Sequence, residues 1–322
     1  MENIKYYTEN LFSENGEWRK KRKAKGRDVT DISVYKHAMT VRNYIIPLWG
    51  EIHPDQLTPK LIDKGLLSVD LAGATRNGIL GCLSTICQYL IEEDIIKDNP
   101  AQKVYRFSNQ PIKKRGVLSP DEIKKLSPLE YKELLRIWRT QMYVVAFLIL
   151  RDTGLRPNEL RALQWQDWDL ERKFFPITKA IEAGKRFKIK GTKTGSIKPA
   201  IVSEFTAQEI ERLKNSITPR PEDFIFIQKS GIPVSSSVFA KNFRAGVKRA
   251  GIDRSEITPY WLRHTFNTRA LERLPDETVR KLMGHASPAM TRHYRHPDIF
   301  SLRHEAEEIA KKMPENLVYC AT

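Results

Sequence analysis

Two short segments place an arginine where it could bind a phosphate group. Residues 152–160 read DTGLRPNEL, with Arg156 directly before a proline. A proline in a first helical turn leaves exposed backbone N–H groups beside Arg156, which is an anion-binding arrangement. Residues 260–265 read YWLRHT and place Tyr260 and Arg263 three apart, on one face of a helix. Taken singly, either arginine also fits an ordinary surface position.

A histidine and a late tyrosine complete the set of side chains that could do chemistry. His285 stands in LMGHAS, and Tyr294 stands among basic residues in TRHYRH. Core histidines and surface tyrosines are common, so neither side chain has a role by itself. Together with two arginines, however, they suit phosphoryl transfer. Arginines form forked hydrogen bonds to the phosphate oxygens that gain charge in the transition state, and a tyrosine hydroxyl can form a covalent ester.

The order and spacing of these segments resemble the tyrosine recombinases, the phage integrase family. Members carry an arginine in a GLRxxEL context, a lysine in a sheet hairpin, an HxxR box, an LGH box and a nucleophilic tyrosine. The matching positions here are Arg156 with Glu159, Lys193, Arg263, His285 and Tyr294.

The resemblance assigns a role to each position. Arg156 and Arg263 would clamp the phosphate, and Glu159 would orient the arginine or histidine partners. Lys193 would protonate the departing 5′ oxygen, with Lys190 and Lys198 as nearby competitors.

Tyr260 stands where the family's first box histidine is found. A phenol, with an ordinary pKa of ~10, donates hydrogen bonds but accepts protons poorly near neutral pH. We therefore expect Tyr260 to bind phosphate rather than act as a base.

The resemblance implies a site-specific recombinase or integrase of a phage or other mobile element. Tyr294 would attack a DNA phosphate and form a 3′-phosphotyrosyl link, which a 5′ hydroxyl of the partner strand then reverses. The implied partners are double-stranded DNA sites and three further copies in a homotetramer, with no metal, cofactor or ATP. Two alternatives remain: a type IB topoisomerase-like enzyme, and a non-cleaving DNA-binding accessory protein, for which Tyr260 is the sequence hint.

The elements that must position these residues divide into two domains. Helical periodicity begins at Asp31 and stops at Pro47 and Gly50, and further helices are expected from Thr58 and over 75–93. Residues 1–105 thus form an all-helical domain, similar to the family's core-binding, SAM-like domain in its YIIPLWG, LTP and NPA segments. Residues 106–116 form a basic linker, and 117–322 form the catalytic domain with its C-terminal tail.

The second domain is expected to be helical around a small antiparallel sheet. Ser119 and Glu122 have the form of a capping box, and residues 142–150 are apolar on all sides, as in a buried helix. Strands are expected at 173–178, 187–190 and 198–202, with a turn at 194–196 between the last two. The fold class is mainly α with a small antiparallel sheet, α+β, and the resemblance implies a two-domain C-shaped DNA clamp. The tail, 300–320, would dock on a neighbouring protomer or on its own domain.

The charge balance points to a polyanionic partner. There are 55 Lys and Arg against 39 Asp and Glu, a formal net charge of +16. Residues 18–27, WRKKRKAKGR, would contact phosphates, the alternative being a solvated loop. The candidate DNA-binding residues are Arg19, Lys20, Lys21, Arg22 and Lys23 and, in the linker, Lys113, Lys114 and Arg115.

Other classes of protein find no support. The longest apolar run, 143–150, is far shorter than the about 20 residues that span a bilayer, and the first 20 residues lack a secretory signal. Three cysteines without a CxxC pair argue against a disulfide framework or a zinc knuckle. A cytoplasmic, nucleoid-associated location is expected. Residues 1–30 are too short for the arm-binding domain of many integrases, so the enzyme lacks one or the chain is truncated.

Overall fold

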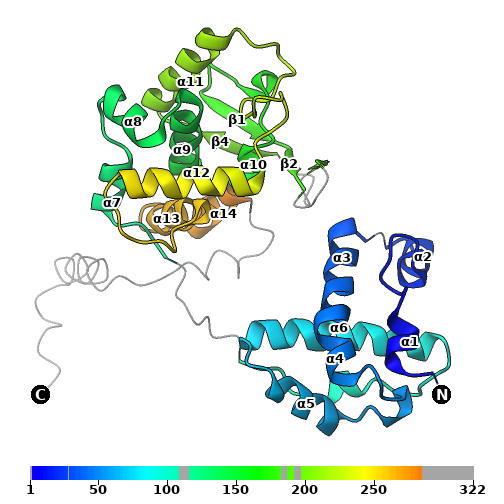
Figure 1. Cartoon of the computed structure of the whole chain (residues 1–322). Coiled ribbons are helices and arrows are strands. Elements are labelled where there is room, and N and C mark those ends of the chain that lie inside the picture. Colours follow the sequence, from blue (N-terminus) through cyan, green and yellow to red (C-terminus); the bar gives the residue numbers. More distant parts are fainter. Residues whose placement is uncertain (1, 28, 109–115, 183–186, 192–196, 285–322) are drawn as a thin grey trace, which may run out of the picture. The chain divides into compact units, whose positions relative to one another are not determined.

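The computed structural model describes residues 2–27, 29–108, 116–182, 187–191 and 197–284 (Figure 1). The chain divides into two compact units between Lys114 and Arg115. Each unit has its own cluster of buried apolar side chains. The expected linker contacts of Lys113, Lys114 and Arg115 lie outside the described residues.

The first unit is all-helical and is organised around one long helix. Its α-helices are α1 (Ile4–Thr8), α2 (Glu17–Ala24), α3 (Asp31–Thr40), α4 (Ile46–Trp49), α5 (Pro59–Ser68) and α6 (Gly73–Glu92), with 3₁₀ turns at Pro54–Gln56 and Pro100–Lys103. Helix α6 buries Ile79, Leu83, Ile86 and Leu90 on one face, as its periodicity predicts. The helices expected from Asp31, Thr58 and over 75–93 are confirmed.

The helix that begins at Asp31 does not stop at Pro47. A π-helical turn, Val41–Ile45, joins α3 to α4, and the rod so formed crosses α6 (Figure 1). Pro47 has no N–H, and its ring would clash with a carbonyl of the preceding turn in a regular α-helix. The wider π turn in front of Pro47 is the kind of local adjustment that lets the helix run on to Trp49.

The second unit packs helices around α9, the buried helix that the apolar run predicts. Its α-helices are α7 (Pro120–Leu126), α8 (Tyr131–Trp138), α9 (Gln141–Thr153), α10 (Pro157–Leu160), α11 (Glu204–Ile217), α12 (Ser236–Arg249), α13 (Pro259–Leu271) and α14 (Asp276–Met283), with a 3₁₀ turn at Trp165–Asp167. Helices α8, α11 and α13 pack on α9 (Figure 1). The capping box of α7 is present: Ser119 Oγ accepts from Glu122 N at 3.1 Å, and Glu122 Oε2 accepts from Ser119 N at 2.8 Å.

The strands form two short antiparallel ladders rather than one sheet. β1 (Phe174–Ile177) pairs with β4 (Lys198–Ile201), and β2 (Lys179–Ile181) pairs with β3 (Ile189–Gly191). The expected pairing of the last two strands through a turn at 194–196 is therefore wrong for the described residues. Residues 174–181 contain β1 and β2 and so provide the partners of both later strands, β4 and β3. Six residues, 192–197, separate β3 from β4. Alternation along a strand reveals its faces, whereas its partner depends on distant segments.

Among the described residues no helix is both long and apolar enough to cross a membrane. Helix α9 is the nearest to such a segment in composition, but it has 13 residues and is buried in the second unit. Its apolar surface is therefore explained by the protein core.

Candidate active site

Arg156 is positioned by a glycine that ends α9. Gly154 has φ +58° and forms the C-cap of that helix. A Cβ at this position would also lie 2.7 Å from the ring of Phe266. Glycine is thus favoured both by the left-handed backbone and by the close approach of α13. The chain then turns and reaches Arg156 at the N-cap of α10.

Glu159 binds both the side chain and the backbone of Arg156. Arg156 Nη1 donates to Glu159 Oε1 at 2.7 Å, and the backbone N–H of Arg156 donates to Glu159 Oε2 at 2.9 Å. At this helix start the N–H of Arg156 itself is therefore occupied by the protein's own carboxylate. The Arg156 side chain remains 35% exposed, while that of Glu159 is buried.

Lys198, the first residue of β4, is the second cation on Glu159. Its Nζ lies 3.2 Å from Glu159 Oε2, and its side chain is 6% exposed. Burial lowers the pKa of Lys198 to about 8; Glu159 opposes this shift, and the guanidinium groups of Arg263 and Arg156 reinforce it. Burial raises the pKa of Glu159, but Lys198 and Arg156 outweigh that effect and hold it below its ordinary value.

Arg263 ties three helices together from a buried position on α13. Its Nη1 donates to Gly154 O at 2.8 Å, at the end of α9, and its Nη2 donates to Met283 O at 3.0 Å, at the end of α14. The next residue, Gly284, has φ +60°, and a Cβ there would lie 3.3 Å from Lys198 Cδ. The end of α14 is thereby held against both Arg263 and Lys198.

The structure thus brings together Arg156, Glu159 and Arg263, with Lys198 at their centre. Tyr260 stands in the first turn of α13 and is 46% exposed, in contrast to the buried Arg263. The expected roles of Lys193, His285 and Tyr294 concern positions outside the described residues. Sequence reasoning named Lys198 as a competitor of Lys193 and did not see its pairing with Glu159. The available signal was alternation, since Lys198 and Ala200 point to the buried side of β4.

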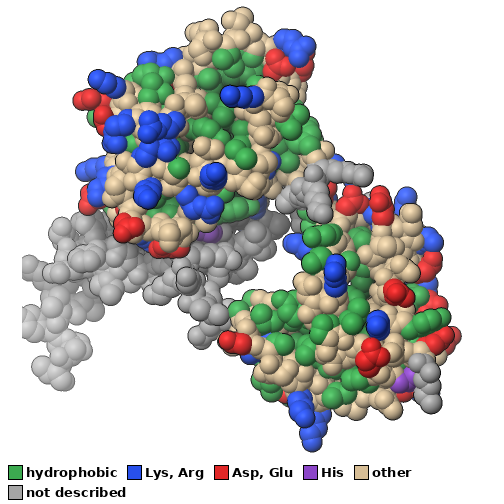
Figure 2. Space-filling view, in the orientation of Figure 1, with side chains coloured by type: hydrophobic (Ala, Val, Ile, Leu, Met, Phe, Trp, Pro, Cys, Tyr) green, Lys and Arg blue, Asp and Glu red, His purple; other side chains and the backbone are tan. Residues whose placement is uncertain are grey.

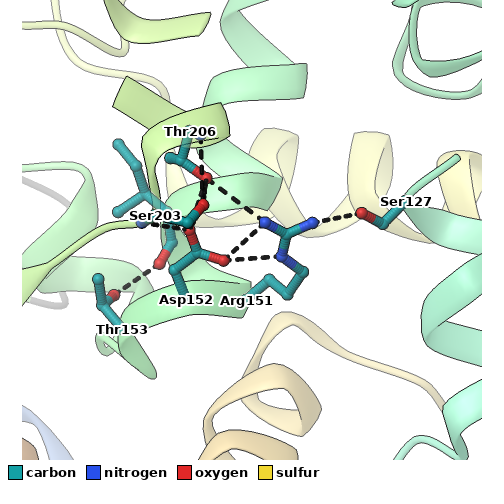
Figure 3. Close-up of polar contacts among 7 residues, drawn as sticks. Ser127, Arg151, Asp152, Thr153, Ser203 and Thr206 are labelled. Carbon is teal, nitrogen blue, oxygen red and sulfur yellow. Dashed lines mark hydrogen bonds and ion pairs between the residues drawn. The ribbon is translucent and has the colours of Figure 1, made fainter. Parts of the chain in front are cut away.

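A polar cluster fixes the two segments that carry Arg156 and Lys198 (Figure 3). The carboxylate of Asp152, in the last turn of α9, accepts hydrogen bonds from Ser203 N at 3.0 Å, Ser203 Oγ at 2.7 Å and Thr206 Oγ1 at 2.5 Å. Arg151 pairs with Asp152 at 2.7 Å and also binds Ser127. Because Ser203 caps α11 directly after β4, Asp152 joins the end of α9 to the end of that strand.

The basic segment of the first unit is a helix, α2, and not the solvated loop considered as the alternative. Four of its cations face carboxylates: Arg19 with Asp31 at 2.8 Å, Lys20 with Glu17 at 2.7 Å, Lys25 with Glu92 at 3.0 Å, and Lys21 with Glu93. Much of the charge of this segment is therefore balanced within the unit.

Arg22 and Arg27 have no carboxylate partner in the described part of the chain. They line a groove of about 400 Å³ between α2 and α6, whose other charged lining residues are Lys21, Lys25 and the carboxylate Glu92, which pairs with Lys25. Arg22 lies over the ring of Trp18 at 5.5 Å, and its Nε is buried without a hydrogen-bond partner among the described residues. The groove is the part of α2 best suited to accept an external anion.

A second basic surface covers α8 and α12 of the second unit, where Lys and Arg side chains gather in Figure 2. On α12, Lys241, Arg244 and Lys248 are exposed, while Phe239, Phe243 and Val247 are buried. Sequence reasoning did not single out this surface. The sequence does indicate it, because Lys241, Arg244 and Lys248 are spaced by three, four and seven residues, which places them on one face of a helix.

A mainly helical unit that gathers two arginines around a buried lysine–carboxylate pair defines a site suited to phosphoryl transfer. The model of the phage integrase family matches residues 117–299. The chain therefore belongs to the phage integrase family, and it is a tyrosine recombinase, that is, a site-specific recombinase. The resemblance seen in the sequence and the mainly α fold with small antiparallel sheets are both confirmed.

Several relatives are similar over most of the chain. Tyrosine recombinase XerC of Thermodesulfovibrio yellowstonii is 28% identical over 275 residues, which cover 83% of this chain and 85% of that protein. The ICEBs1 integrase of Bacillus subtilis is 28% identical over 245 residues, which cover 71% of this chain and 62% of that protein.

Two solved structures share the fold. The Tn1549 transposon integrase, in complex with transposon right end DNA, has a TM-score of 0.75 at 21% identity and covers 96% of this chain and 99% of that one. A lambda integrase dimer bound to a core site has a TM-score of 0.60 at 17% identity and covers 86% of this chain and 75% of that one.

Proposed function

We propose that this chain cleaves and rejoins double-stranded DNA at specific sites through a 3′-phosphotyrosyl intermediate on Tyr294. The observation that carries the proposal is the convergence of Arg156 and Arg263 on the buried pair of Lys198 and Glu159. Lys198 and Arg156 pair with the one carboxylate, and Arg263 interacts electrostatically with Lys198, so the cluster has an excess of positive charge beside a partly exposed arginine. Such an excess suits a phosphodiester that gains negative charge as it is attacked.

Each step of the reaction uses a side chain of the protein. The Tyr294 hydroxyl gives its proton to water and bonds to phosphorus, the bond from phosphorus to the 5′ oxygen breaks, and Lys193 protonates that oxygen. Arg156 and Arg263 stabilise the non-bridging oxygens, His285 and Tyr260 bind the phosphate by hydrogen bonds, and Glu159 orients Arg156. The guanidinium groups supply the positive charge that a metal ion would otherwise provide.

The phosphotyrosyl ester retains the energy of the broken bond, so resealing needs no ATP. The 5′ hydroxyl of the partner strand attacks the ester, releases Tyr294 and restores a phosphodiester. Exchange of strands between two paired sites requires four active sites, which a homotetramer provides.

In this proposal both units bind DNA, and the second also carries out catalysis. Residues 1–105 act as the core-binding domain, residues 117–322 as the catalytic domain, and the basic residues of the linker at 106–116 lie along the phosphates. The groove beside α2 and the basic surface over α8 and α12 support this assignment. The likeness to the ICEBs1 and Tn1549 integrases favours a mobile element as the source of the enzyme. An enzyme that acts on the DNA of such an element would work in the cytoplasm, at the nucleoid.

Covalent trapping tests the proposal. A DNA duplex nicked next to the scissile phosphate loses the short 5′-hydroxyl fragment after cleavage, and the wild-type chain should remain attached to the 3′ phosphate of the cleaved strand. Tyr294→Phe should abolish the adduct, whereas Tyr260→Phe should reduce its rate of formation by about 10-fold, the loss of one phosphate hydrogen bond.

An adduct that survives Tyr294→Phe would refute the assignment of the nucleophile. A second assay addresses the reaction as a whole: relaxation of supercoiled DNA without exchange between two sites would identify a topoisomerase-like enzyme instead. Binding without any adduct in the wild type would identify a non-cleaving accessory protein.

A further inference from the structure

Both carboxylate oxygens of Glu159 accept hydrogen bonds from within the protein. Its Oε1 accepts from Arg156 Nη1, and its Oε2 accepts both from the Arg156 backbone and from Lys198 Nζ. The carboxylate is thus shared between an arginine that is partly exposed and a lysine that is buried. Any movement of the carboxylate would move the guanidinium of Arg156 with it.

Lys198 is the anchor on the buried side of this carboxylate. It sits at the first position of β4, where Ile177 is its partner across the ladder, and Asp152 holds the far end of the same strand to α9. Gly284 packs against its methylene groups from the other side. The backbone around Lys198 is therefore fixed by its pairing with β1 and by the contact of Asp152 with the segment that follows β4.

We propose that Lys198 is a positioning residue of the recombination site, whose ammonium group holds Glu159 and, through it, the Arg156 guanidinium in the orientation that binds the scissile phosphate. This inference rests on the proposed function. It assigns Lys198 a different role from the general acid for which the sequence made it a competitor of Lys193.

Burial separates these two roles. A general acid must reach the departing oxygen, and Lys198 is 6% exposed with its Nζ directed at Glu159. A lysine in that position can act on the phosphate only through its neighbours. Loss of its charge would leave a buried carboxylate with Arg156 as its remaining cationic partner, free to draw the guanidinium inward.

The test is a double-mutant cycle on the full chain with the nicked DNA substrate. Single-turnover cleavage is measured at saturating enzyme, beside the Kd for DNA and the melting temperature. Lys198→Met keeps the length of the side chain without the charge, and Lys198→Arg keeps the charge. Lys173→Met, at an exposed lysine near the same sheet, is the matched control.

We expect Lys198→Met to slow cleavage by about 10²-fold, the cost of one misplaced phosphate ligand, with the Kd changed less than about 3-fold. Lys198→Arg should recover about 10-fold of that loss, and Lys173→Met should cleave like the wild type. Because Lys198 acts through Glu159, Lys198→Met should add little to Glu159→Gln, so that the double variant is about as slow as the slower single variant.

A substrate with sulfur in place of the bridging 5′ oxygen separates positioning from proton donation. A thiolate leaves without a proton, so this substrate should restore cleavage to Lys193→Ala but not to Lys198→Met. Restoration of Lys198→Met would identify Lys198 as the proton donor and overturn the inference.

Three other results would also overturn it: normal cleavage by Lys198→Met, losses that multiply in the double variant, or a loss that disappears at a temperature where the variant is fully folded. No adduct with the wild-type chain would instead refute the proposed function itself, whereas an active wild type with an unaffected Lys198→Met refutes the positioning role alone.

Discussion

Arg156 and Arg263 reach the same cluster by different means. Arg263 is buried and donates to two main-chain carbonyls, those of Gly154 and Met283. Arg156 is partly exposed and depends on the side chain of Glu159. Arg263 is thus part of the framework of the unit, whereas the orientation of Arg156 is set by neighbouring charges. The arginine that depends on charges is the one whose position a single substitution nearby can change.

The lowered pKa of Lys198 makes stability depend on pH. Its pKa is about 8 in the folded chain and 10.5 ordinarily. Between these values the unfolded chain binds more protons than the folded one, so the free energy of unfolding rises with pH. Glu159, Arg156 and Arg263 are the charged groups that act on Lys198 in this range.

We therefore expect the wild type to gain stability relative to Lys198→Met between pH 8 and about 10, by an amount on the order of 1 kcal/mol or more. Urea unfolding of both chains at several pH values measures the difference. Titrations elsewhere in the protein cancel in the comparison. Parallel curves for the two chains would show that the lysine has an ordinary pKa.

At the scale of elements, Asp152 fastens α9 to the junction of β4 and α11. It satisfies the N-cap residue Ser203 and the buried Thr206 at once, and Arg151 extends the contact to Ser127 (Figure 3). Arg156 follows the end of α9 in the chain, and Lys198 begins the strand that leads into the junction. The relative positions of Arg156 and Lys198 therefore depend on this contact between elements.

Asp152→Ala should lower the free energy of unfolding by about 1–3 kcal/mol, because it removes the acceptor of the buried Thr206 hydroxyl and the partner of Arg151. Chemical denaturation measures this loss. Glu204→Ala is the control at the same junction, since Glu204 is exposed and pairs with Lys173, and it should cost less than about 1 kcal/mol. Equal losses for the two variants would contradict the role given to Asp152.

Helix α2 and the turn that follows it, residues 17–27, offer a second prediction at this scale, because two pairs of their cations can be compared. Arg22 and Arg27 line the groove beside α6, whereas Arg19 and Lys20 pair with carboxylates. Arg22→Gln with Arg27→Gln should reduce the slope of log K against log salt by about 2, one unit for each DNA phosphate that these arginines neutralise in the wild type.

Arg19→Gln with Lys20→Gln removes the same formal charge and serves as the control. It should reduce the slope by less than about 1, and filter binding at several salt concentrations measures both. If the control lowers the slope as much as the groove variant, the effect is one of net charge and the groove has no special part in binding.

Local patterns in the sequence predict the helices and much of the site. They fail where contacts with distant segments determine the structure. The capping box of Ser119 and the apolar run of α9 are local and are confirmed. The π turn before Pro47, the partner of β4 and the pairing of Lys21 with Glu93 depend on tertiary contacts. The pairing of Lys198 with Glu159 belongs to the same group, because alternation along a strand can indicate that a lysine faces inward but not which residue, here 39 positions away, it meets.

At the scale of the whole molecule, the two units have separate cores. The buried side chains of residues 4–104 form one cluster and those of residues 118–262 form another. We therefore expect residues 1–108 and 117–322 to fold when produced separately, each with one cooperative unfolding transition. Calorimetry of the two pieces measures this.

Each piece should bind site DNA at least about 10²-fold more weakly than the intact chain, because the linker turns the second contact into an intramolecular one. Two pieces mixed without the linker should not recover the affinity of the whole. A catalytic piece that binds as tightly as the intact chain would contradict a role for the first unit in binding.

The use of main-chain atoms around Arg263 bears on how such proteins diverge. Any amino acid at position 283 presents a carbonyl to this arginine, so the contact itself does not depend on which side chain stands there. Lys198 and Glu159 form an ion pair through their side chains, so this contact does depend on the identity of both residues. A substitution of one should be tolerated only together with a substitution of the other. Substitutions that leave the first contact intact should therefore be commoner than substitutions at Lys198 or Glu159, which should occur together.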